Sequence, residues 1–313
     1  MFNKTTLSGH KGNVNCLCTL DNILYSGSDD KTVRMWDIRT GKALKCFTSC
    51  FSEPVESICT SNNTQFYVAC NNEVLLFDTR YYKDNELIIK SPSSIVCTTD
   101  GDDNVVNSMN INEDGSMLAV SDDNSAIGLY SIKNENKNEN MNESDSVVQC
   151  PQYNQEFMLS NNIHSGIISS LLFNKKSHKP DSMFLYSGGF DSIAALWEIN
   201  KHNENIENNQ DNQNTQVTSN ILNLNQINVD FTTQANPNPN PNQIVNPPYI
   251  HQMESILSTG VACAVGDGSI SILSSTLNNE HYSINLVHRI DSAHDGMVTT
   301  LTALDSNTLC SSG

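Results

Sequence analysis

The chain has 313 residues, of which 37% are hydrophobic, and its 35 acidic and 17 basic residues give a net charge of −18. The low hydrophobic fraction predicts that part of the chain lies outside any packed core. The acidic balance argues against a nucleic-acid-binding surface, because such surfaces depend on clustered Lys and Arg. There is no apolar run of about 18 residues to span a membrane, and the N-terminus lacks the basic-then-apolar pattern of a signal peptide.

The ten cysteines show neither the CxxC spacing of metal sites nor an obvious pairing scheme. Cys16 and Cys18 lie on one face of a predicted strand, two residues apart. Most of the other cysteines lie in apolar runs. Free cysteine behaves as a small core residue in reducing compartments. We therefore expect structural thiols, no metal site, no cofactor, and a location in the cytoplasm, the nucleus or both.

The stretch from Gly9 to Arg39 contains three runs with strand character: Val14–Leu20, Ile23–Gly27 and Thr32–Trp36. Pairs of Asp and Asn residues separate the runs, and these residue types favour turns. The stretch opens with Gly-His and closes with Trp-Asp. It resembles one WD repeat, the four-stranded blade of a β-propeller.

The resemblance implies a buried tetrad in which the Trp N–H donates to Ser, and His bonds to both Ser and Asp. In the first repeat its members are His10, Ser26, Asp30 and Trp36. The same Ser-to-Asp-to-Trp spacing returns in a fourth repeat, with His164, Ser187, Asp191 and Trp197. Each member has a polar group that would cost roughly 1–3 kcal/mol if buried without a partner. A structural role is therefore favoured over a catalytic His–Asp pair.

Other repeats keep the strand pattern but lose parts of the tetrad. Phe77, Tyr130 and Leu273 take the Trp position in the second, third and fifth repeats, and a sixth begins at His294 with Ser311 at the Ser position. The resemblance implies an all-β WD-repeat propeller of about five blades and a truncated sixth, belonging to a complete protein of seven blades. The expected blades are about 9–47, 48–80, 104–132, 160–199, 247–274 and 290–313.

Two Asn-rich segments, about 133–155 and 200–246, interrupt the repeats. Their composition cannot bury enough apolar surface to offset the entropy lost on ordering, so we expect disordered inserts. The runs Met117–Ile132 and Val245–His251, together with the repeat from His164 to Trp197, resemble one branch of the WD-repeat proteins. In that branch an insertion also precedes the fifth blade.

Two consecutive repeats end in an Asp-x-Arg sequence, with Asp37 and Arg39 in the first and Asp78 and Arg80 in the second. The WDxR pattern resembles that of proteins that dock on damaged-DNA-binding protein 1, the adaptor of cullin-4 ubiquitin ligases. Arg offers a planar fork of donors for carboxylates and carbonyls. The alternative is that these Asp and Arg side chains only fasten the loop after the third strand.

The expected function is a non-catalytic protein-interaction scaffold, and the WDxR resemblance implies a substrate receptor of a cullin-4 RING ligase. The alternative is a generic WD-repeat scaffold, or a peptide or histone reader, in another complex. An enzyme is disfavoured, since no P-loop, HExxH motif or nucleophile–base arrangement is present. We expect protein partners and no direct nucleic-acid or membrane binding.

Overall fold

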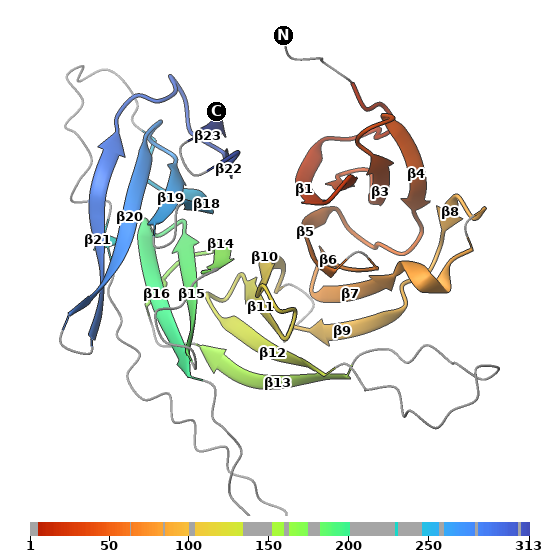
Figure 1. Ribbon diagram of the computed structural model, residues 1–313, viewed down its shortest axis with the longest axis horizontal. Coiled ribbons are helices and arrows are strands. Elements are labelled where there is room, and N and C mark those ends of the chain that lie inside the picture. The colour runs from red at the N-terminus through yellow and green to blue at the C-terminus, as the bar shows by residue number, and fades with distance from the viewer. Residues whose placement is uncertain are drawn as a thin grey trace, which may run out of the picture. The chain divides into compact units, whose positions relative to one another are not determined.

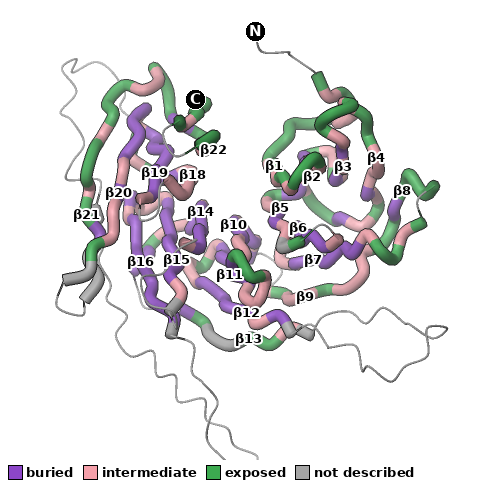
Figure 2. Tube along the Cα trace, in the orientation of Figure 1, coloured by how far each residue is buried: buried purple, intermediate pink, exposed green. Residues whose placement is uncertain are grey.

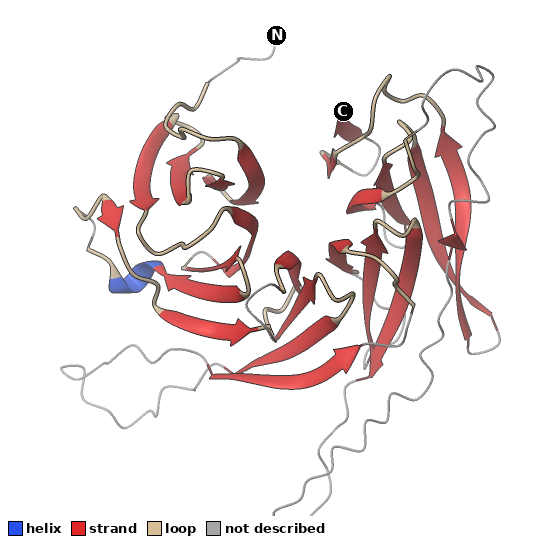
Figure 3. Ribbon diagram, turned by 180° about the vertical axis from the view of Figure 1, so that it is seen from behind, coloured by secondary structure: helices blue, strands red, loops and turns tan. Residues whose placement is uncertain are grey.

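The computed structural model describes residues 6–62, 64–83, 85–99, 104–133, 152–159, 163–174, 182–200, 229–230, 246–256, 260–278, 281–305 and 308–313. These residues form strands joined by turns, with one short helix, η1, at Thr79–Tyr81 (Figure 3). They divide into two compact units. One comprises Met1–Ser160 with Gly166–Ile168, and the other comprises Asn161–Ser165 with Ser169–Gly313.

The first unit contains three sheets (Figure 1). The first has four antiparallel strands and a fifth, β8, that pairs in parallel with β4: β1 (Val14–Leu20), β2 (Ile23–Ser28), β3 (Thr32–Asp37), β4 (Lys42–Phe47) and β8 (Ile88–Ile89). The second contains β5 (Val55–Asn62), β6 (Gln65–Cys70), β7 (Glu73–Asp78) and β9 (Ser94–Thr98). The third contains β10 (Val106–Ile111), β11 (Met117–Asp122), β12 (Ile127–Lys133) and β13 (Gln152–Leu159).

The second unit contains the remaining strands, except that β14 begins at the last residue of the first unit. One sheet has β14 (Ile168–Phe173), β15 (Ser182–Gly189), β16 (Ile193–Asn200) and β17 (Val229–Asp230). The next has β18 (Ile250–Ile256), β19 (Gly260–Val265), β20 (Ile270–Asn278) and β21 (His281–Ile290). The last described pair is β22 (Thr300–Ala303) with β23 (Leu309–Ser312).

The turn between the second and third strands repeats one backbone feature in four of these sheets. The residue after the tetrad Asp position has a positive φ: 59° at Lys31, 61° at Ser125, 66° at Ser192 and 86° at Gly268. L residues adopt this region at a cost, and short polar side chains or glycine reduce it. The repeated turn explains why Asp, Asn and Gly cluster between the strand runs of the sequence.

Apolar cores lie between successive sheets of each unit. Tyr25, Val33 and Phe47 of the first sheet pack with Phe66 and Phe77 of the second. Similar clusters join the second sheet to the third, and the sheet of β18 to those of β15 and β22. Figure 2 shows buried residues along β6, β7, β15 and β16. Because burial of apolar area is the main favourable term in folding, sheet-to-sheet packing holds each unit together.

The predicted strand runs agree with the structure, but several predicted blade limits are too short. Outer strands lie beyond the ranges 48–80, 104–132 and 247–274, as β9, β13 and β21. The described strands extend into both ends of the predicted insert of about 133–155, because β12 includes Lys133 and β13 begins at Gln152. The insert 200–246 likewise overlaps β16 at Asn200 and contains β17. Most other residues of the two inserts lie outside the described part of the chain.

Candidate functional site

The first tetrad forms a continuous hydrogen-bond chain. The Trp36 indole Nε1 donates to Ser26 Oγ at 2.9 Å, and His10 Nε2 lies 2.7 Å from the same oxygen. His10 Nδ1 lies 3.1 Å from Asp30 Oδ2. Thr32 Oγ1 also donates to Asp30, at 2.6 Å. The loop before β1 is thereby fastened to the turn between β2 and β3.

The second tetrad repeats this geometry in the other unit. Trp197 Nε1 donates to Ser187 Oγ at 2.8 Å, and His164 Nε2 lies 2.8 Å from that oxygen. His164 Nδ1 lies 3.0 Å from Asp191 Oδ2. The structure thus brings together all eight residues that the sequence placed in tetrads, four in each unit.

The acidic members of the tetrads are held ionised by their partners. Burial alone would raise the pKa of Asp30, but hydrogen bonds from Thr32, the Lys11 backbone and His10 lower it to about 2. Burial also opposes ionisation of Asp191, and hydrogen bonds led by that from His164 lower its pKa. A carboxylate with a depressed pKa is a poor general base at neutral pH, which favours a structural role for both His–Asp pairs.

Two other sheets have different polar pairs near the turn between their second and third strands. Asn104 Nδ2 donates to Asp122 Oδ2 at 2.9 Å in the third sheet, and Arg289 forms an ion pair with Asp267 in the sheet of β18–β21. Asp267 precedes Leu273 by six residues, the spacing of Asp to Trp in the tetrads, but no sequence pattern pairs it with Arg289. One sequence feature could have drawn attention to Arg289: it is the only Lys or Arg after Lys201.

The last described pair of strands shows the beginning of a tetrad. His294 Nε2 lies 2.8 Å from Ser311 Oγ, the same contact that His10 makes with Ser26 and His164 makes with Ser187. The sequence placed both residues in these positions from their spacing alone. Cys263, at the Ser position of the preceding sheet, is fully buried, and burial raises the pKa of its thiol.

The turn after β3 carries the first Asp-x-Arg sequence. Asp37 Oδ1 accepts a hydrogen bond from the Arg39 backbone N–H at 2.9 Å, which fixes the turn. The Arg39 Nε lies 3.7 Å from the same oxygen, too far for a hydrogen bond, and 71% of the Arg39 side chain is exposed. The backbone of this turn is therefore organised, while the guanidinium remains open to solvent.

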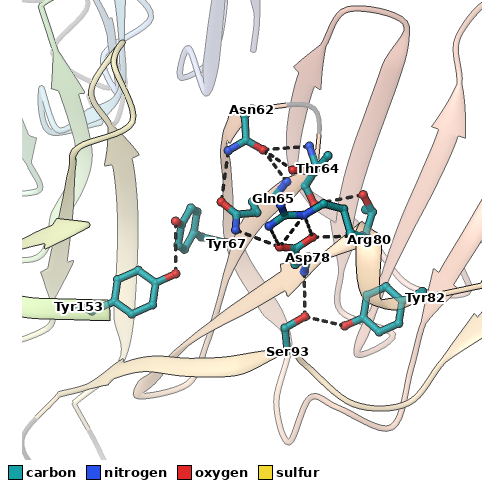
Figure 4. A network of polar contacts seen from close by, with 10 residues as sticks. Asn62, Thr64, Gln65, Tyr67, Asp78, Arg80, Tyr82, Ser93 and Tyr153 are labelled. Atoms are coloured by element: carbon teal, nitrogen blue, oxygen red, sulfur yellow. Dashed lines mark hydrogen bonds and ion pairs between the residues drawn. The ribbon is translucent and has the colours of Figure 1, made fainter. Parts of the chain in front are cut away.

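The turn after β7 carries the second copy and is built differently (Figure 4). The Asp78 side chain is fully buried and accepts hydrogen bonds from Arg80 Nε at 2.9 Å and Gln65 Nε2 at 3.0 Å. The Arg80 Nη2 forms an ion pair with the other carboxylate oxygen. Burial would raise the pKa of Asp78, but the hydrogen bonds from Arg80 and Gln65 outweigh it and lower the pKa.

A wider polar network surrounds Asp78. Its backbone N–H donates to Ser93 Oγ at 2.9 Å, and the Tyr82 hydroxyl lies 3.2 Å from the same oxygen (Figure 4). Asn62 Nδ2 in turn donates to Gln65 Oε1 at 3.2 Å. Sequence reasoning paired Asp78 only with Arg80 and missed Gln65, whose position on the adjacent strand becomes evident only from the strand register.

No cluster suited to metal binding is found among the residues that the structure describes. The nine cysteines in that part of the chain are free. The one short helix described is neither long nor apolar enough to cross a membrane. The candidate site is therefore the pair of turns after β3 and β7, and within it Arg39 is the more exposed arginine.

Comparisons with known proteins agree with this architecture. The WD40 family, described as WD domain, G-beta repeat, matches residues 2–37. Over 290 residues the chain is 24% identical to WD repeat-containing protein 53 homolog of Dictyostelium discoideum, and the match covers 91% of this chain and 68% of that protein. This relative belongs to the branch that Met117–Ile132 and the fourth repeat indicate.

Solved structures show the same fold at low sequence identity. The structure of the RRP9 WD40 repeats matches with a TM-score of 0.61 and 15% identity, covering 96% of this chain and 72% of that one. A chain of the mitotic checkpoint complex matches with a TM-score of 0.58 and 13% identity, covering 93% and 68%. These likenesses show the fold alone: an all-β, propeller-like arrangement containing several four-stranded antiparallel sheets.

Proposed function

Because the chain belongs to the WD40-repeat family, we propose that it is a non-catalytic protein-interaction scaffold that docks a partner through the turn after β3. The observation that carries the proposal is Arg39, whose side chain is largely exposed while Asp37 holds its backbone. An exposed guanidinium on a fixed turn is pre-organised for a carboxylate or a pair of carbonyls.

The non-catalytic part of the proposal is supported by where the reactive residue types lie. His10 and His164 each bridge a Ser and an Asp inside a tetrad. In both tetrads the Trp N–H also donates a hydrogen bond to the Ser hydroxyl. Those serines are buried and hydrogen-bonded on both sides, which leaves no approach for a substrate. The tetrads therefore support a scaffold rather than a hydrolase.

The partner that we propose is damaged-DNA-binding protein 1, with this chain as a substrate receptor of a cullin-4 RING ligase. The support is the WDxR resemblance together with the exposed Arg39. The second copy has a different role in this proposal. Arg80 binds its own Asp78, so it fastens the turn and contributes less to docking.

A pull-down of the adaptor with purified variants tests the proposal. Arg39→Ala should reduce recovery of the adaptor about tenfold, because interface arginines are frequent hot spots. Lys42→Ala, in the same exposed region at the start of β4, is the matched control and should bind as the unaltered protein does. Failure of the unaltered protein to recover the adaptor would remove the ligase assignment.

A second candidate function, a reader of basic peptides, is favoured by one cluster in the second unit. The Phe190 ring stacks on Tyr249 at a centroid distance of 5.5 Å and meets His251 edge-on at 5.3 Å. Among the described residues of this unit, Arg289 is the only Lys or Arg, so its surface is acidic. Aromatic faces attract Lys and Arg side chains.

We extend the proposal to the number of blades and to the cellular compartment of the protein. We take each described sheet as one blade, with β22 and β23 as the first strands of a sixth, and the packing between successive sheets supports this. The seven-bladed complete protein stays a prediction. The nine free thiols support a reducing location, in the cytoplasm or the nucleus, because disulfides persist in oxidising compartments.

A further inference from the structure

The segment 79–93 between β7 and β9, called the strap below, leaves its own sheet and attaches to the neighbouring one. Its β8 lies beside β4, the outer strand of the first sheet (Figure 1). The carbonyls of Leu87 and Ile89 accept hydrogen bonds at 2.8 Å from the backbone N–H groups of Cys46 and Thr48. On the inner side, Ile89 is buried in the core around Phe47. The strap is therefore an ordered part of the first unit.

The opposite side of the strap is open. The side chains of Leu87 and Ile88 are 63% and 55% exposed, whereas the side chain of Ile89, which faces the core, is buried. In a parallel ladder, the backbone groups of alternate residues point to opposite sides of the strand. Since Leu87 and Ile89 point their carbonyls at β4, the N–H and C=O of Ile88 point away from it. No other described strand pairs with that edge.

Two hollows flank β8, and Ile88 lines both. One, of about 570 Å³, has a mixed lining: Tyr81, Tyr82, Ile89 and Pro92 lie beside the polar residues Glu86, Lys90, Ser91 and Ser93. The other, of about 580 Å³, is lined by Leu87 and by three cations, Lys11, Arg34 and Lys45. The free edge of β8 thus lies between a hollow with aromatic and polar side chains and a second hollow, called the basic hollow below, that contains three cations.

The basic hollow has an unsatisfied donor. Arg34 Nε is buried and has no hydrogen-bond partner, which costs free energy until an acceptor reaches it. The only carboxylate lining this hollow is Asp30, and the tetrad already holds it through His10 and Thr32. The hollow therefore contains three cations and a single carboxylate that already has partners within the tetrad.

The charge distribution along the sequence supports the same conclusion. Residues 1–90 contain ten of the 17 Lys and Arg, matched by ten Asp and Glu, so the net charge of −18 comes entirely from the rest of the chain. The Lys and Arg of the strap and of the sheet that it joins are therefore the main cationic feature of an acidic protein. These cations attract acidic groups that come into contact with them, while salt screens the repulsion from the more distant negative charge over about 10 Å.

We propose that the strap docks an extended acidic segment of a partner protein, which adds a strand to the free edge of β8. A carboxylate of that segment reaches Arg34 and Lys11, and an apolar side chain enters the hollow beside Tyr81. Main-chain pairing supplies affinity in such strand addition, and alternate side chains supply specificity. This site is separate from the Arg39 turn and does not depend on the adaptor assignment.

Fluorescence anisotropy with the full chain tests the proposal, using labelled peptides of alternating Glu and Val or alternating Lys and Val. The Glu–Val peptide should bind saturably and the Lys–Val peptide should not. Leu87→Asp and Lys11→Glu should each weaken the Glu–Val peptide about tenfold, through lost apolar contact and reversed charge. Equal midpoints of urea unfolding would show that these variants remain folded.

Two matched controls make the result specific to the strap. Val287→Asp replaces an equally exposed residue, at 63%, in β21, and Lys42→Glu reverses a charge in β4 that lines neither hollow. Both should bind the Glu–Val peptide as the unaltered protein does. The proposal is overturned if that peptide does not bind, if the Lys–Val peptide binds equally well, or if the controls lose binding as much as the strap variants.

Discussion

The turns after β3 and β7 carry the same Asp-x-Arg sequence and have different structures. In the first, Asp37 organises the backbone and leaves the Arg39 side chain 71% exposed. In the second, Asp78 is fully buried and binds both Arg80 and Gln65. A short motif therefore does not fix the role of its residues, because the adjacent strand decides whether the Asp has a second buried partner.

The largest expected effect comes from removing the carboxylate of the buried copy. Asp78→Ala leaves Gln65 Nε2 and the Arg80 guanidinium without their acceptor, so it should destabilise the protein by about 3 kcal/mol. Asp37→Ala is the matched change in the first copy and should destabilise the protein less, because Asp37 has no second buried side-chain partner of the kind that Gln65 supplies to Asp78. Urea unfolding of both variants measures the difference, and equal costs would contradict the contrast between the turns.

The tetrads are buried hydrogen-bond networks whose contribution to stability can be compared with that of the network around Asp78. Ser187→Ala removes the acceptor of Trp197 Nε1 and the partner of His164 Nε2, and should cost about 2 kcal/mol in unfolding free energy. Ser165→Ala, at an exposed side chain beside the same tetrad, should change the unfolding free energy by less than about 0.5 kcal/mol. A neutral Ser187→Ala would mean that the tetrad does not stabilise the fold.

Acid should weaken the hydrogen-bond networks around the buried carboxylates. The pKa values of Asp30, Asp78 and Asp191 are lowered in the folded state, so the unfolded chain takes up protons first as the pH falls. Their stabilisation is complete above the unfolded pKa of about 3.9 and is lost as the pH falls through the folded values. For Asp30 that value is about 2.

The measurement is the unfolding free energy between pH 5 and pH 2, followed by urea titration. It should fall most steeply below about pH 4. Asp191→Asn should flatten part of that fall, because it removes one of the carboxylates with a lowered pKa. A slope that is unchanged in Asp191→Asn would contradict the assignment of acid sensitivity to the tetrads.

Local features of the fold were predictable from the sequence. The run Val14–Leu20 is identical to β1, and the tetrad residues meet as their spacing indicated. Both depend on alternation and turn residues within one repeat, which are local signals. The outer strand β13 was missed because its first five residues, QYNQE, are mostly polar and resemble a loop.

Features that depend on contacts between repeats were not predictable. The parallel pairing of β8 with β4 joins segments about 40 residues apart, and a two-residue strand has no periodic pattern to reveal it. The different roles of Arg39 and Arg80 depend on Gln65, which reaches Asp78 from β6. The sequence predicted the same role for both turns, and their different structures could not be distinguished from the motif alone.

The most direct test of this account compares Arg39→Ala and Arg80→Ala in two measurements on the same samples, adaptor affinity and urea unfolding. We predict that Arg39→Ala lowers affinity about tenfold with stability unchanged, because its side chain makes no hydrogen bond within the protein. Arg80→Ala should lower stability by about 1 kcal/mol and affect affinity less. Equal losses of affinity with no change in stability for either variant would contradict the account.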